Sequence, residues 1–413
     1  MNKINILGIN ISLVSKKEVL VNIEAFLKSK KQHYITTPNP EIILMAEKDE
    51  EYFYILNNAD ISIMDGFGLK IAAWLSGKNV TRITGADLTT DILKLASEKK
   101  SRVVIFNWSG GLSTSLEIKD SIEKKFPGLS FLVIDLDKGQ ESIDYDKINL
   151  FSPEIALVAL GAPWQERFIN QNLKKLSSVK VAIGIGGAID FITGKARRAP
   201  KFFRFLGLEW LWRVFQQKKI PGKKVFFLNR FKRIYRAVFV FSWKFFVWRF
   251  ILPFFYRKNV ACLLYKKEDD KYKILIVERV WQKEHWQLPQ GGTECQDIME
   301  AGARELREEL NTDKFKSVAG FNDLWKYKFK KYAGSGKYLA DKHWGYKGQS
   351  QGLFIAEFQG EDQDIRLNYW DHIAWKWTDV DDLTKEVYST RRESTEVFLN
   401  KFIEIINKNE TTN

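Results

Sequence analysis

The first 195 residues alternate short runs rich in Val and Ile with segments of helical periodicity, and this alternation constrains the fold more than any other feature. The apolar runs predict buried strands, and the segments between them carry apolar residues at i, i+3 and i+4. A repeated strand–helix order predicts a mainly parallel sheet covered by helices on both faces. The opening INILGINISLVS is expected to add a small hairpin. The predicted strands are HYITT, ISIMD, RVVIFNW, LSFLVID, EIALVALG and VKVAIGIG.

The composition changes abruptly after this region. From Lys195 to Lys258 the only acidic residue is Glu209, whereas Lys and Arg recur every few positions among Phe, Trp and Tyr. The net charge of +14 is therefore concentrated in one stretch, which marks a domain boundary. A chain of 413 residues is also too long for one typical core, so at least two folded domains are expected.

Beyond the basic stretch the periodicity differs. The runs NVACLLYKK and YKILIVER, separated by the polar EDDK, predict a hairpin. A helix over CQDIMEAGARELREEL, two further strands and a closing helix from about Thr390 follow, which is typical of an α+β domain. We therefore predict a Rossmann-like α/β domain at 1–195, a basic, aromatic, amphipathic helical segment at 196–256 and an α+β domain at 257–413.

Cysteine and histidine usage bears on compartment and on metals. Cys262 and Cys295 give neither a disulfide framework nor a zinc spacing, and four scattered histidines do not predict a transition-metal site. The N-terminus lacks the charged-then-apolar pattern of a signal peptide, so a reducing cytoplasm is the expected compartment.

Polar or glycine-rich turns follow three predicted strands, at 36–40, 65–68 and 184–190. Ligands of open α/β sheets bind at the carboxyl ends of the strands, so these turns are candidate site segments. Asp65 directly follows ISIM and precedes a glycine, and could serve as a general base that a substrate can approach. The alternative, that Asp65 caps the following helix, is equally open at this point. The third turn alone lacks the glycine spacing of a dinucleotide fingerprint.

Six blocks taken in order carry a resemblance: TPNPEIILMA, NADISIMDGFGLKIAAWLSGK, RITGADL, LGAPWQERFI, IGGAIDFITGKARRAP and GLEWLWRVFQQ. Together they resemble the WecB/TagA/CpsF family of glycosyltransferases, over roughly residues 3–250. The resemblance implies transfer of an N-acetylhexosamine, with N-acetylmannosamine as the expected sugar, from a UDP-sugar to a polyprenyl-diphosphate-linked sugar. Such transfer belongs to the synthesis of cell-surface polysaccharide or teichoic acid.

The resemblance also implies roles for individual residues. Asp65 stands at the general-base position, which would deprotonate the acceptor hydroxyl while the anomeric carbon inverts. No DxD-type metal motif stands where such a cation would be held, so arginines are expected to neutralise the leaving UDP in place of a metal. The segments FNWSGG and LVIDLDKGQ depart from the expected pattern. The other expected catalytic or substrate-binding residues are Thr37, Asn39, Arg82, Gln165, Gly186, Gly187, Arg198 and Arg213.

The basic aromatic segment is expected to lie on an anionic membrane surface. From Ala237 to Tyr256 about a dozen apolar residues favour bilayer insertion by roughly 4 to 7 kcal/mol, and Lys244 and Arg249 oppose it by about 5 to 7 kcal/mol. Spanning is therefore not favoured, whereas a flat helix allows Phe and Trp to enter the interface and the basic residues to meet anionic lipid. The alternatives are a basic helix packed on the first domain and, less favoured, nucleic-acid binding. The expected location is the cytoplasmic face of the cell membrane.

Three carboxylates follow one another on a helical face of the last domain. Glu305, Glu308 and Glu309 stand at i, i+3 and i+4, where like charges oppose each other by about 0.2–0.5 kcal/mol per pair. Arg304 and Arg307 could offset this on a solvated helix, but Mg²⁺, which prefers oxygen ligands, would offset it better. The preceding PQGG supplies a tight loop whose carbonyl could join the coordination.

This pattern resembles the Nudix box of pyrophosphohydrolases, and the match covers roughly residues 257–408. The lead-in LPQGG and the later WGYKGQSQGLFIAEFQGED resemble the branch that hydrolyses dinucleoside polyphosphates and RNA 5′ ends. The resemblance implies that Glu305, Glu308 and Glu309 hold Mg²⁺ and that Asp371 assists. Three departures stand out: the stretch from Gly291 to Arg304 is one residue short, and Gln296 and Asn311 replace a glutamate and a glycine.

The whole chain thus predicts a bifunctional enzyme, a membrane-surface glycosyltransferase joined to a Nudix hydrolase of a nucleoside diphosphate derivative. A second interpretation gives the last domain a non-catalytic, nucleotide-sensing role. A third uses the basic segment for RNA. A homo-oligomer is compatible with all three.

Overall fold

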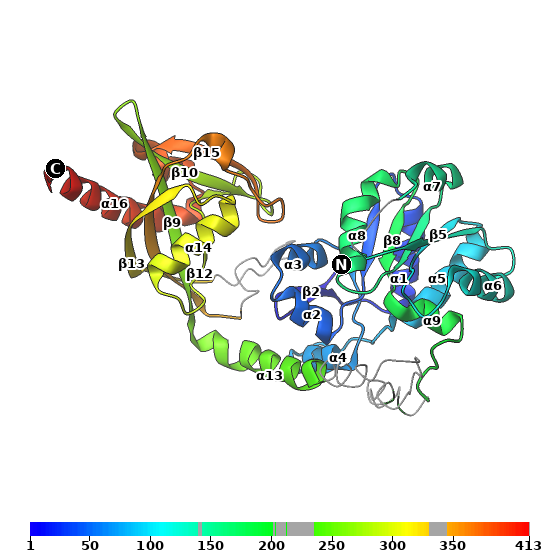
Figure 1. Ribbon diagram of the computed structural model, residues 1–413. Coiled ribbons are helices and arrows are strands. Elements are labelled where there is room, and N and C mark those ends of the chain that lie inside the picture. Colours follow the sequence, from blue (N-terminus) through cyan, green and yellow to red (C-terminus); the bar gives the residue numbers. More distant parts are fainter. Residues whose placement is uncertain (139–142, 201–202, 204–211, 213–234, 330–344, 413) are drawn as a thin grey trace, which may run out of the picture. The chain divides into compact units, whose positions relative to one another are not determined.

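The computed structural model describes residues 1–138, 143–200, 203, 212, 235–329 and 345–412. The chain divides into two compact units, an N-terminal unit of Met1–Phe246 and a C-terminal unit of Val247–Asn413 (Figure 1). Each unit is described by itself.

The N-terminal unit contains a six-stranded sheet in the order β4-β3-β8-β7-β5-β6. Every neighbouring pair is parallel, which confirms the predicted α/β class. Each of the six apolar runs forms one of these strands. Their bounds are β3 (His33–Thr36), β4 (Ile61–Ser62), β5 (Val103–Trp108), β6 (Phe131–Leu136), β7 (Ile155–Ala159) and β8 (Val181–Gly184).

Helices pack on both faces of this sheet (Figure 1). Strand β5 shows why its run is continuously apolar: Val103 and Ile105 face one cluster with the first set of helices, and Val104 and Phe106 face another with the second set. The first set is α1 (Lys16–Leu27), α5 (Gly85–Lys99), α6 (Ser115–Lys125) and α9 (Ile189–Ile192). The second set is α7 (Tyr145–Phe151) and α8 (Trp164–Asn172). The remaining helices of the sheet region are α2 (Pro40–Ala46), α3 (Glu50–Asn57), α4 (Phe67–Leu75), η1 (Leu173–Lys175) and η2 (Gly186–Ala188).

The predicted hairpin forms at the N-terminus from β1 (Lys3–Ile6) and β2 (Ile9–Ser12). Its turn residues Leu7 and Gly8 both have positive φ, at 50° and 90°. This is the backbone that a two-residue hairpin needs, and glycine adopts it without strain.

The aromatic helix runs through η3 (Arg236–Val240), α13 (Phe241–Phe246), η4 (Val247–Ile251) and η5 (Leu252–Phe254). Within the N-terminal unit, Phe241 and Phe245 are buried, and α13 packs on α2 and α4. The Nζ of Lys244 lies 2.5 Å from the Glu47 carboxylate. The stretch Arg236–Phe254 is also long and apolar enough to cross a membrane by length and composition alone.

The C-terminal unit is built on a seven-stranded mixed sheet with the path β11-β10-β9-β14-β13, with β12 paired to β9 and β15 to β10. The β9–β14 pair is parallel, and the other pairs are antiparallel. The predicted hairpin turns at Asp269 and Asp270, which both have positive φ. The strands are β9 (Tyr256–Glu268), β10 (Lys271–Arg279), β11 (Trp286–Gln287), β12 (Gln290–Gly292), β13 (Phe315–Lys328), β14 (Gly348–Phe358) and β15 (His372–Asp379).

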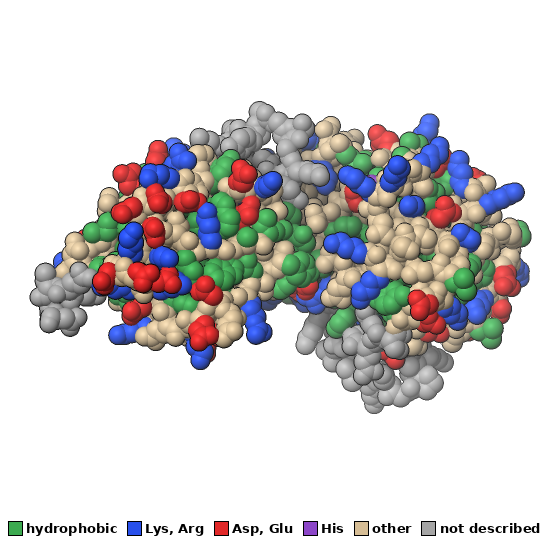
Figure 2. Space-filling view, turned by 90° about the horizontal axis from the view of Figure 1, so that it is seen from above, with side chains coloured by type: hydrophobic (Ala, Val, Ile, Leu, Met, Phe, Trp, Pro, Cys, Tyr) green, Lys and Arg blue, Asp and Glu red, His purple; other side chains and the backbone are tan. Residues whose placement is uncertain are grey.

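Two long helices cover opposite faces of this sheet. Alternate residues of β9 separate into two clusters, with Cys262 on the side of α14 (Ile298–Leu310) and Leu263 on the side of α16 (Arg392–Thr412). Short helices complete the unit: η6 (Asp362–Asp364), η7 (Val380–Asp382), α15 (Leu383–Glu386) and η8 (Ser389–Arg391). On the face of this unit seen in Figure 2, acidic and basic side chains are intermingled. The structure therefore confirms an α+β fold after the parallel-sheet unit.

Candidate functional site

Asp65 and Thr37 meet at the carboxyl end of the parallel sheet. The Asp65 N–H donates to the Pro38 carbonyl over 2.9 Å, which ties the loops after β4 and β3 together. Gly85, the first residue of α5, donates its N–H to Asp65 Oδ2 over 3.3 Å. A Cβ at Gly85 would lie 3.5 Å from Asp65 Oδ2 and 3.9 Å from Thr37 Oγ1, so Gly85 stands between the two side chains.

This arrangement bears on the two roles considered for Asp65. The N-cap of α4, the helix that follows Asp65, is Gly66 at φ 123°. The half-buried carboxylate instead accepts a hydrogen bond from the backbone N–H at the N-terminus of α5. An ionised carboxylate at this edge is what a general base requires.

Gln165 is held against the glycine turn after β8. Its Oε1 accepts the Gly186 N–H over 2.8 Å, and its side chain is buried. Gly186 has φ 50°, a conformation that favours glycine, and a Cβ at Gly184 would lie only 2.7 Å from Gln165 Nε2. Thr37 Oγ1 donates to the Gly184 carbonyl over 3.2 Å. The structure thus brings Thr37, Gln165 and Gly186 together.

Gln165 is oriented by a residue that the sequence did not single out. Glu166 is 0% exposed, and its Oε1 accepts from Gln165 Nε2 over 2.6 Å. Its Oε2 accepts from the Tyr52 hydroxyl over 3.1 Å. Burial raises the pKa of the Glu166 carboxyl, and no Lys or Arg pairs with it among the described residues. Glu166 therefore acts on the site through Gln165.

Two further predicted residues, Asn39 and Arg198, are held by hydrogen bonds within the N-terminal unit. Asn39 is the N-cap of α2, and its Oδ1 accepts the N–H groups of Glu41 and Ile42. Arg198 donates through Nη2 to both carboxylate oxygens of Asp87, over 2.8 and 2.9 Å.

The remaining predicted residues of this unit lie around the same turns. Arg198 Nη2 also reaches Thr84 Oγ1 at 3.4 Å, which places Arg198 beside Gly85. Arg82 is half-buried in the segment leading to α5, and a Cβ at Gly187 would lie 3.4 Å from Asp190 Oδ2. Arg213 lies outside the described residues.

The divergent turn after β5 is organised by Trp108. Lys138 Nζ lies over the face of the Trp108 ring, 3.6 Å from its centroid. A Cβ at Gly110 would lie 2.9 Å from the same ring. Glycine at that position therefore gives the indole its space. Asn107 is buried and donates to Asp135 Oδ1 over 2.8 Å. The departure thus has a structural account.

In the C-terminal unit, the predicted metal ligands divide into two groups. Glu305 and Glu309 are each 7% exposed, whereas the Glu308 side chain is 53% exposed. Arg304 Nη1 lies between Glu305 Oε1, at 2.8 Å, and Glu308 Oε2, at 2.7 Å. A Cβ at Gly291 would collide with the Glu305 carboxylate, so this glycine allows β12 to approach α14.

Glu309 points toward a different set of side chains. Its Oε2 accepts the Gln290 N–H over 3.2 Å. Ligand atoms of Glu309, Asp371 and His372 lie within 4.8 Å of one another. His372 is 2% exposed, and burial lowers its pKa, so that the imidazole is neutral near pH 7. His372 could not be singled out from the sequence, because it stands in an ordinary strand pattern.

The departures from the Nudix box also have structural accounts. Glu294 and Cys295 both have positive φ, at 50° and 66°, which tightens the shortened loop. Gln296 accepts from Arg304 Nε over 2.8 Å. Asn311 ends α14 at φ 49°, a left-handed conformation that Asn tolerates nearly as well as Gly.

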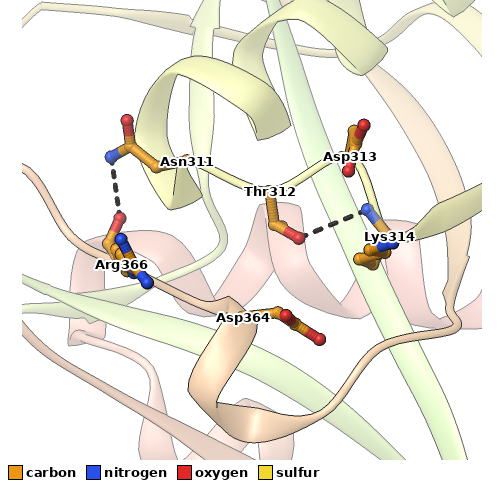
Figure 3. A pocket seen from close by; sticks show the side chains of 6 residues that line it. All are labelled: Asn311, Thr312, Asp313, Lys314, Asp364 and Arg366. Carbon is orange, nitrogen blue, oxygen red and sulfur yellow. Dashed lines mark hydrogen bonds between the residues drawn. The ribbon is translucent and has the colours of Figure 1, made fainter.

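Asn311 also lines a surface pocket of about 400 Å³ (Figure 3). Its Nδ2 donates to the Arg366 carbonyl over 2.8 Å, and Thr312 Oγ1 accepts the Lys314 N–H over 3.2 Å. None of the predicted site residues lines this pocket, so it is separate from the carboxylate cluster.

Buried amides adjoin Gly291. Asn259 donates to the Gly291 carbonyl over 2.6 Å, and Gln351 Nε2 donates to Asn259 Oδ1 and to Gln290 Oε1, over 2.9 and 2.8 Å. Gln351 and Asn259 are at most 2% exposed. The sheet interior beside the glutamates is therefore polar and hydrogen-bonded.

Comparison with known proteins assigns the two parts of the chain to two different families. Residues 4–251 match the model of the glycosyl transferase WecG/TagA/CpsF family, and residues 255–398 match that of the NUDIX domain. A relative from Bacillus spizizenii, an N-acetylglucosaminyldiphosphoundecaprenol N-acetyl-beta-D-mannosaminyltransferase, is 35% identical over 192 residues, which are 46% of this chain and 73% of that protein. A protein of the same name from Staphylococcus aureus is 28% identical over 228 residues, 54% of this chain and 87% of its own length.

Solved structures of Nudix type are similar to part of the chain. A C. elegans Ap4A hydrolase has 21% identity and a TM-score of 0.27, covering 37% of this chain and 98% of its own. The E. coli dihydroneopterin triphosphate pyrophosphohydrolase has 20% identity and a TM-score of 0.27, covering 35% and 98%. The family model spans more than half of the chain, and the Bacillus relative shares more than a third of the aligned residues. The chain therefore belongs to the WecG/TagA/CpsF family of glycosyl transferases and carries a NUDIX domain after the family region.

Proposed function

We propose that the N-terminal unit transfers N-acetylmannosamine from a UDP-sugar to a polyprenyl-diphosphate-linked N-acetylglucosamine. The observation that carries this proposal is the meeting of Asp65, Thr37 and Gly85 at the carboxyl end of the sheet. The printed names of the two relatives support the donor sugar and the lipid-linked acceptor.

The proposed reaction is an inverting displacement. Asp65 takes the proton from the acceptor hydroxyl as its oxygen attacks the anomeric carbon. The bond between that carbon and the UDP oxygen breaks, and the β-phosphate leaves with the electron pair. Arg82, Arg198 and Arg213 are the proposed cations that stabilise the negative charge on UDP, in place of a metal.

A transfer assay with Asp65→Asn tests this role. With UDP-N-acetylmannosamine and a lipid-diphosphate-N-acetylglucosamine acceptor, we expect kcat to fall about a hundred- to ten-thousand-fold, because the amide cannot take the proton. Asp91→Asn is a matched control, since Asp91 lies within α5 and pairs with Lys16 over 2.8 Å. A chelator should leave transfer unchanged. Wild-type activity in Asp65→Asn, or loss of transfer with the chelator, would contradict the mechanism.

We further propose that the aromatic helix rests on the membrane that holds the acceptor. Phe239, Trp243 and Phe246 are 63%, 63% and 47% exposed and recur at i, i+4 and i+7, on the side away from buried Phe241 and Phe245. Such a stripe would enter the lipid interface.

The packing of this helix links it to the loop that carries Asp65. A Cβ at Gly68 would lie 3.6 Å from the Phe241 ring. The helix is therefore anchored three residues beyond the proposed base. This position would bring the base to the lipid surface.

Vesicle sedimentation tests this surface. Serine at Phe239, Trp243 and Phe246 should weaken binding to anionic vesicles at least about tenfold, because burying aromatic area is a main source of interfacial affinity. Leu116→Ser, at a 67% exposed position on α6, is the control. Unchanged vesicle binding in the triple variant would exclude the stripe, and tight RNA binding at physiological salt would favour a nucleic-acid role instead.

For the C-terminal unit we propose Mg²⁺-dependent hydrolysis of a nucleoside diphosphate-linked compound. The carboxylates of Glu305, Glu308 and Glu309 on α14 are the proposed ligands, and Mg²⁺ would polarise the diphosphate and activate water there. Glu305 and Glu309 are buried, and Gly291 of β12 leaves room for the Glu305 carboxylate, which supports this role. Arg304 would have to release Glu305 and Glu308 as the ion binds.

A hydrolysis screen of the full chain discriminates this activity from nucleotide sensing. The substrates are UDP-sugars, diadenosine polyphosphates and 5′-triphosphorylated RNA. Product formation that needs Mg²⁺ and is lost in Glu308→Gln would support hydrolysis. Nucleotide binding without turnover of any substrate would support the sensor.

A further inference from the structure

Glu309, Asp371 and His372 bring ligand atoms from two separate elements to one place. Glu309 lies in the last turn of α14, whereas His372 is the first residue of β15 and Asp371 directly precedes it. One oxygen from each carboxylate and one ring nitrogen lie within 4.8 Å of one another. Donor atoms on opposite sides of a six-coordinate ion are about 4.2 Å apart at a bond length near 2.1 Å, so small movements would close these three on one ion.

His372 lacks the hydrogen bonds that a buried imidazole normally makes. Its side chain is 1% exposed, and neither ring nitrogen has a hydrogen-bond partner among the described residues. Asp371 Oδ2 lies 3.6 Å from Nδ1, which is too long for a hydrogen bond. An unpaired buried polar group costs free energy, and a metal ion would satisfy one nitrogen.

We propose that Glu309, Asp371 and His372 hold a first-row transition ion such as Mn²⁺ in preference to Mg²⁺. Mg²⁺ takes oxygen ligands almost exclusively, whereas imidazole nitrogen is a good ligand for transition ions. The two carboxylates balance the charge of a divalent ion. This site differs from the proposed Mg²⁺ face, with which it shares only Glu309, and it does not depend on hydrolysis.

The surrounding residues bear on the same site. The Gln290 N–H orients one oxygen of Glu309, as outer hydrogen bonds orient metal ligands elsewhere. Arg279 lies opposite His372 in the β10–β15 ladder and adds a positive charge nearby. The positive charge of Arg279 repels a bare cation, but the two negative carboxylates outweigh this repulsion. The same positive charge favours an ion that also binds a phosphate oxygen.

Pulsed EPR of Mn²⁺ bound to the untagged full chain tests the site directly. We expect a ¹⁴N coupling from a directly bound imidazole in the wild type and its loss in His372→Gln. Mn²⁺ affinity should fall at least about tenfold in this variant, while Mg²⁺ affinity changes much less. His285→Gln is the control, because His285 is another buried histidine of the same unit outside the cluster.

A second variant keeps the test decisive if His372→Gln does not fold. Asp371→Asn retains the imidazole but loses one carboxylate, so Mn²⁺ should bind more weakly and still show the ¹⁴N coupling at saturation. Absence of the coupling in the wild type, its persistence in a folded His372→Gln, or unchanged Mn²⁺ affinity in Asp371→Asn would each overturn the proposal.

Discussion

Replacing Glu166 by alanine should damage the N-terminal unit in a way that its contacts allow to be estimated. The fully buried carboxyl accepts hydrogen bonds from Gln165 Nε2 and from the Tyr52 hydroxyl. Glu166→Ala would leave both donors buried without an acceptor, at about 1–3 kcal/mol each. We therefore expect the free energy of unfolding to fall by about 2–6 kcal/mol. Glu166→Gln keeps the volume and one acceptor, and should cost only about 1 kcal/mol.

The same change should reach the proposed donor site. Without Glu166, Gln165 loses the bond that fixes its amide, and its 2.8 Å contact with the Gly186 N–H weakens. If the loss of this orientation costs the binding free energy of about one hydrogen bond, KM for the UDP-sugar should rise roughly tenfold. A proton-transfer role is not expected, so the pH dependence of kcat should keep its shape in Glu166→Gln.

The pH dependence of stability gives a further readout. Burial raises the pKa of Glu166 above its ordinary value near 4.5, so the folded state holds the proton more tightly than the unfolded state. The stabilising contribution is present below the unfolded pKa and is lost as pH rises through the folded pKa. Glu166→Gln should abolish this slope.

Thermal unfolding of the wild type and both variants across pH, together with KM, tests the reasoning. If Glu166→Ala unfolds at the wild-type temperature with an unchanged KM, the network has no such role. Equal damage in Glu166→Gln and Glu166→Ala would likewise refute the acceptor argument.

Three other outcomes follow from particular contacts. Gly184→Ala places a Cβ 2.7 Å from Gln165 Nε2 and should lower stability by about 1–3 kcal/mol and raise KM for the UDP-sugar in the same transfer assay. Gly291→Ala should displace Glu305 and abolish Mg²⁺-dependent hydrolysis in the screen, while circular dichroism stays native. Burial lowers the pKa of His285 to about 3, so the unfolded chain takes up the proton first as pH falls below about 6.5. Calorimetry should show the C-terminal unit losing about 2 kcal/mol between about pH 8 and pH 5, and His285→Gln should remove that dependence.

The strands of the parallel sheet could be predicted because residues buried on both faces form continuous apolar runs. β13 (Phe315–Lys328) could not, because its pairing with β14 shifts register between Ser317 and Ala319 and again between Phe321 and Trp325. The first shift adds one residue to β13 and reverses which face the following side chains occupy, and the second adds two residues outside the ladder, so no regular alternation extends along the strand. The two hairpin turns could be predicted because each lies between two apolar runs.

A site residue could be predicted where its place in the chain, close after a strand, is enough to put it at the ligand-binding edge of the sheet. Thr37 follows β3 directly and Asp65 lies three residues after β4, and the carboxyl ends of parallel strands meet at one edge. The contact of Tyr52 with Glu166 spans 114 residues, and nothing in the local sequence indicates it. Glu309 and His372 likewise meet only because β15 pairs with β10 next to α14.

The two proposed centres would solve the same electrostatic problem in opposite ways. A diphosphate carries negative charge that must be stabilised when a bond to it breaks. The N-terminal unit places arginine side chains near the edge of its sheet, and Asp87 holds Arg198 in position. The positive charge that would stabilise the diphosphate is therefore supplied by side chains of the protein. The C-terminal unit instead buries Glu305 and Glu309, which repel a diphosphate until a cation binds. Transfer should therefore be independent of metal and hydrolysis controlled by it, even though both reactions act on one class of group.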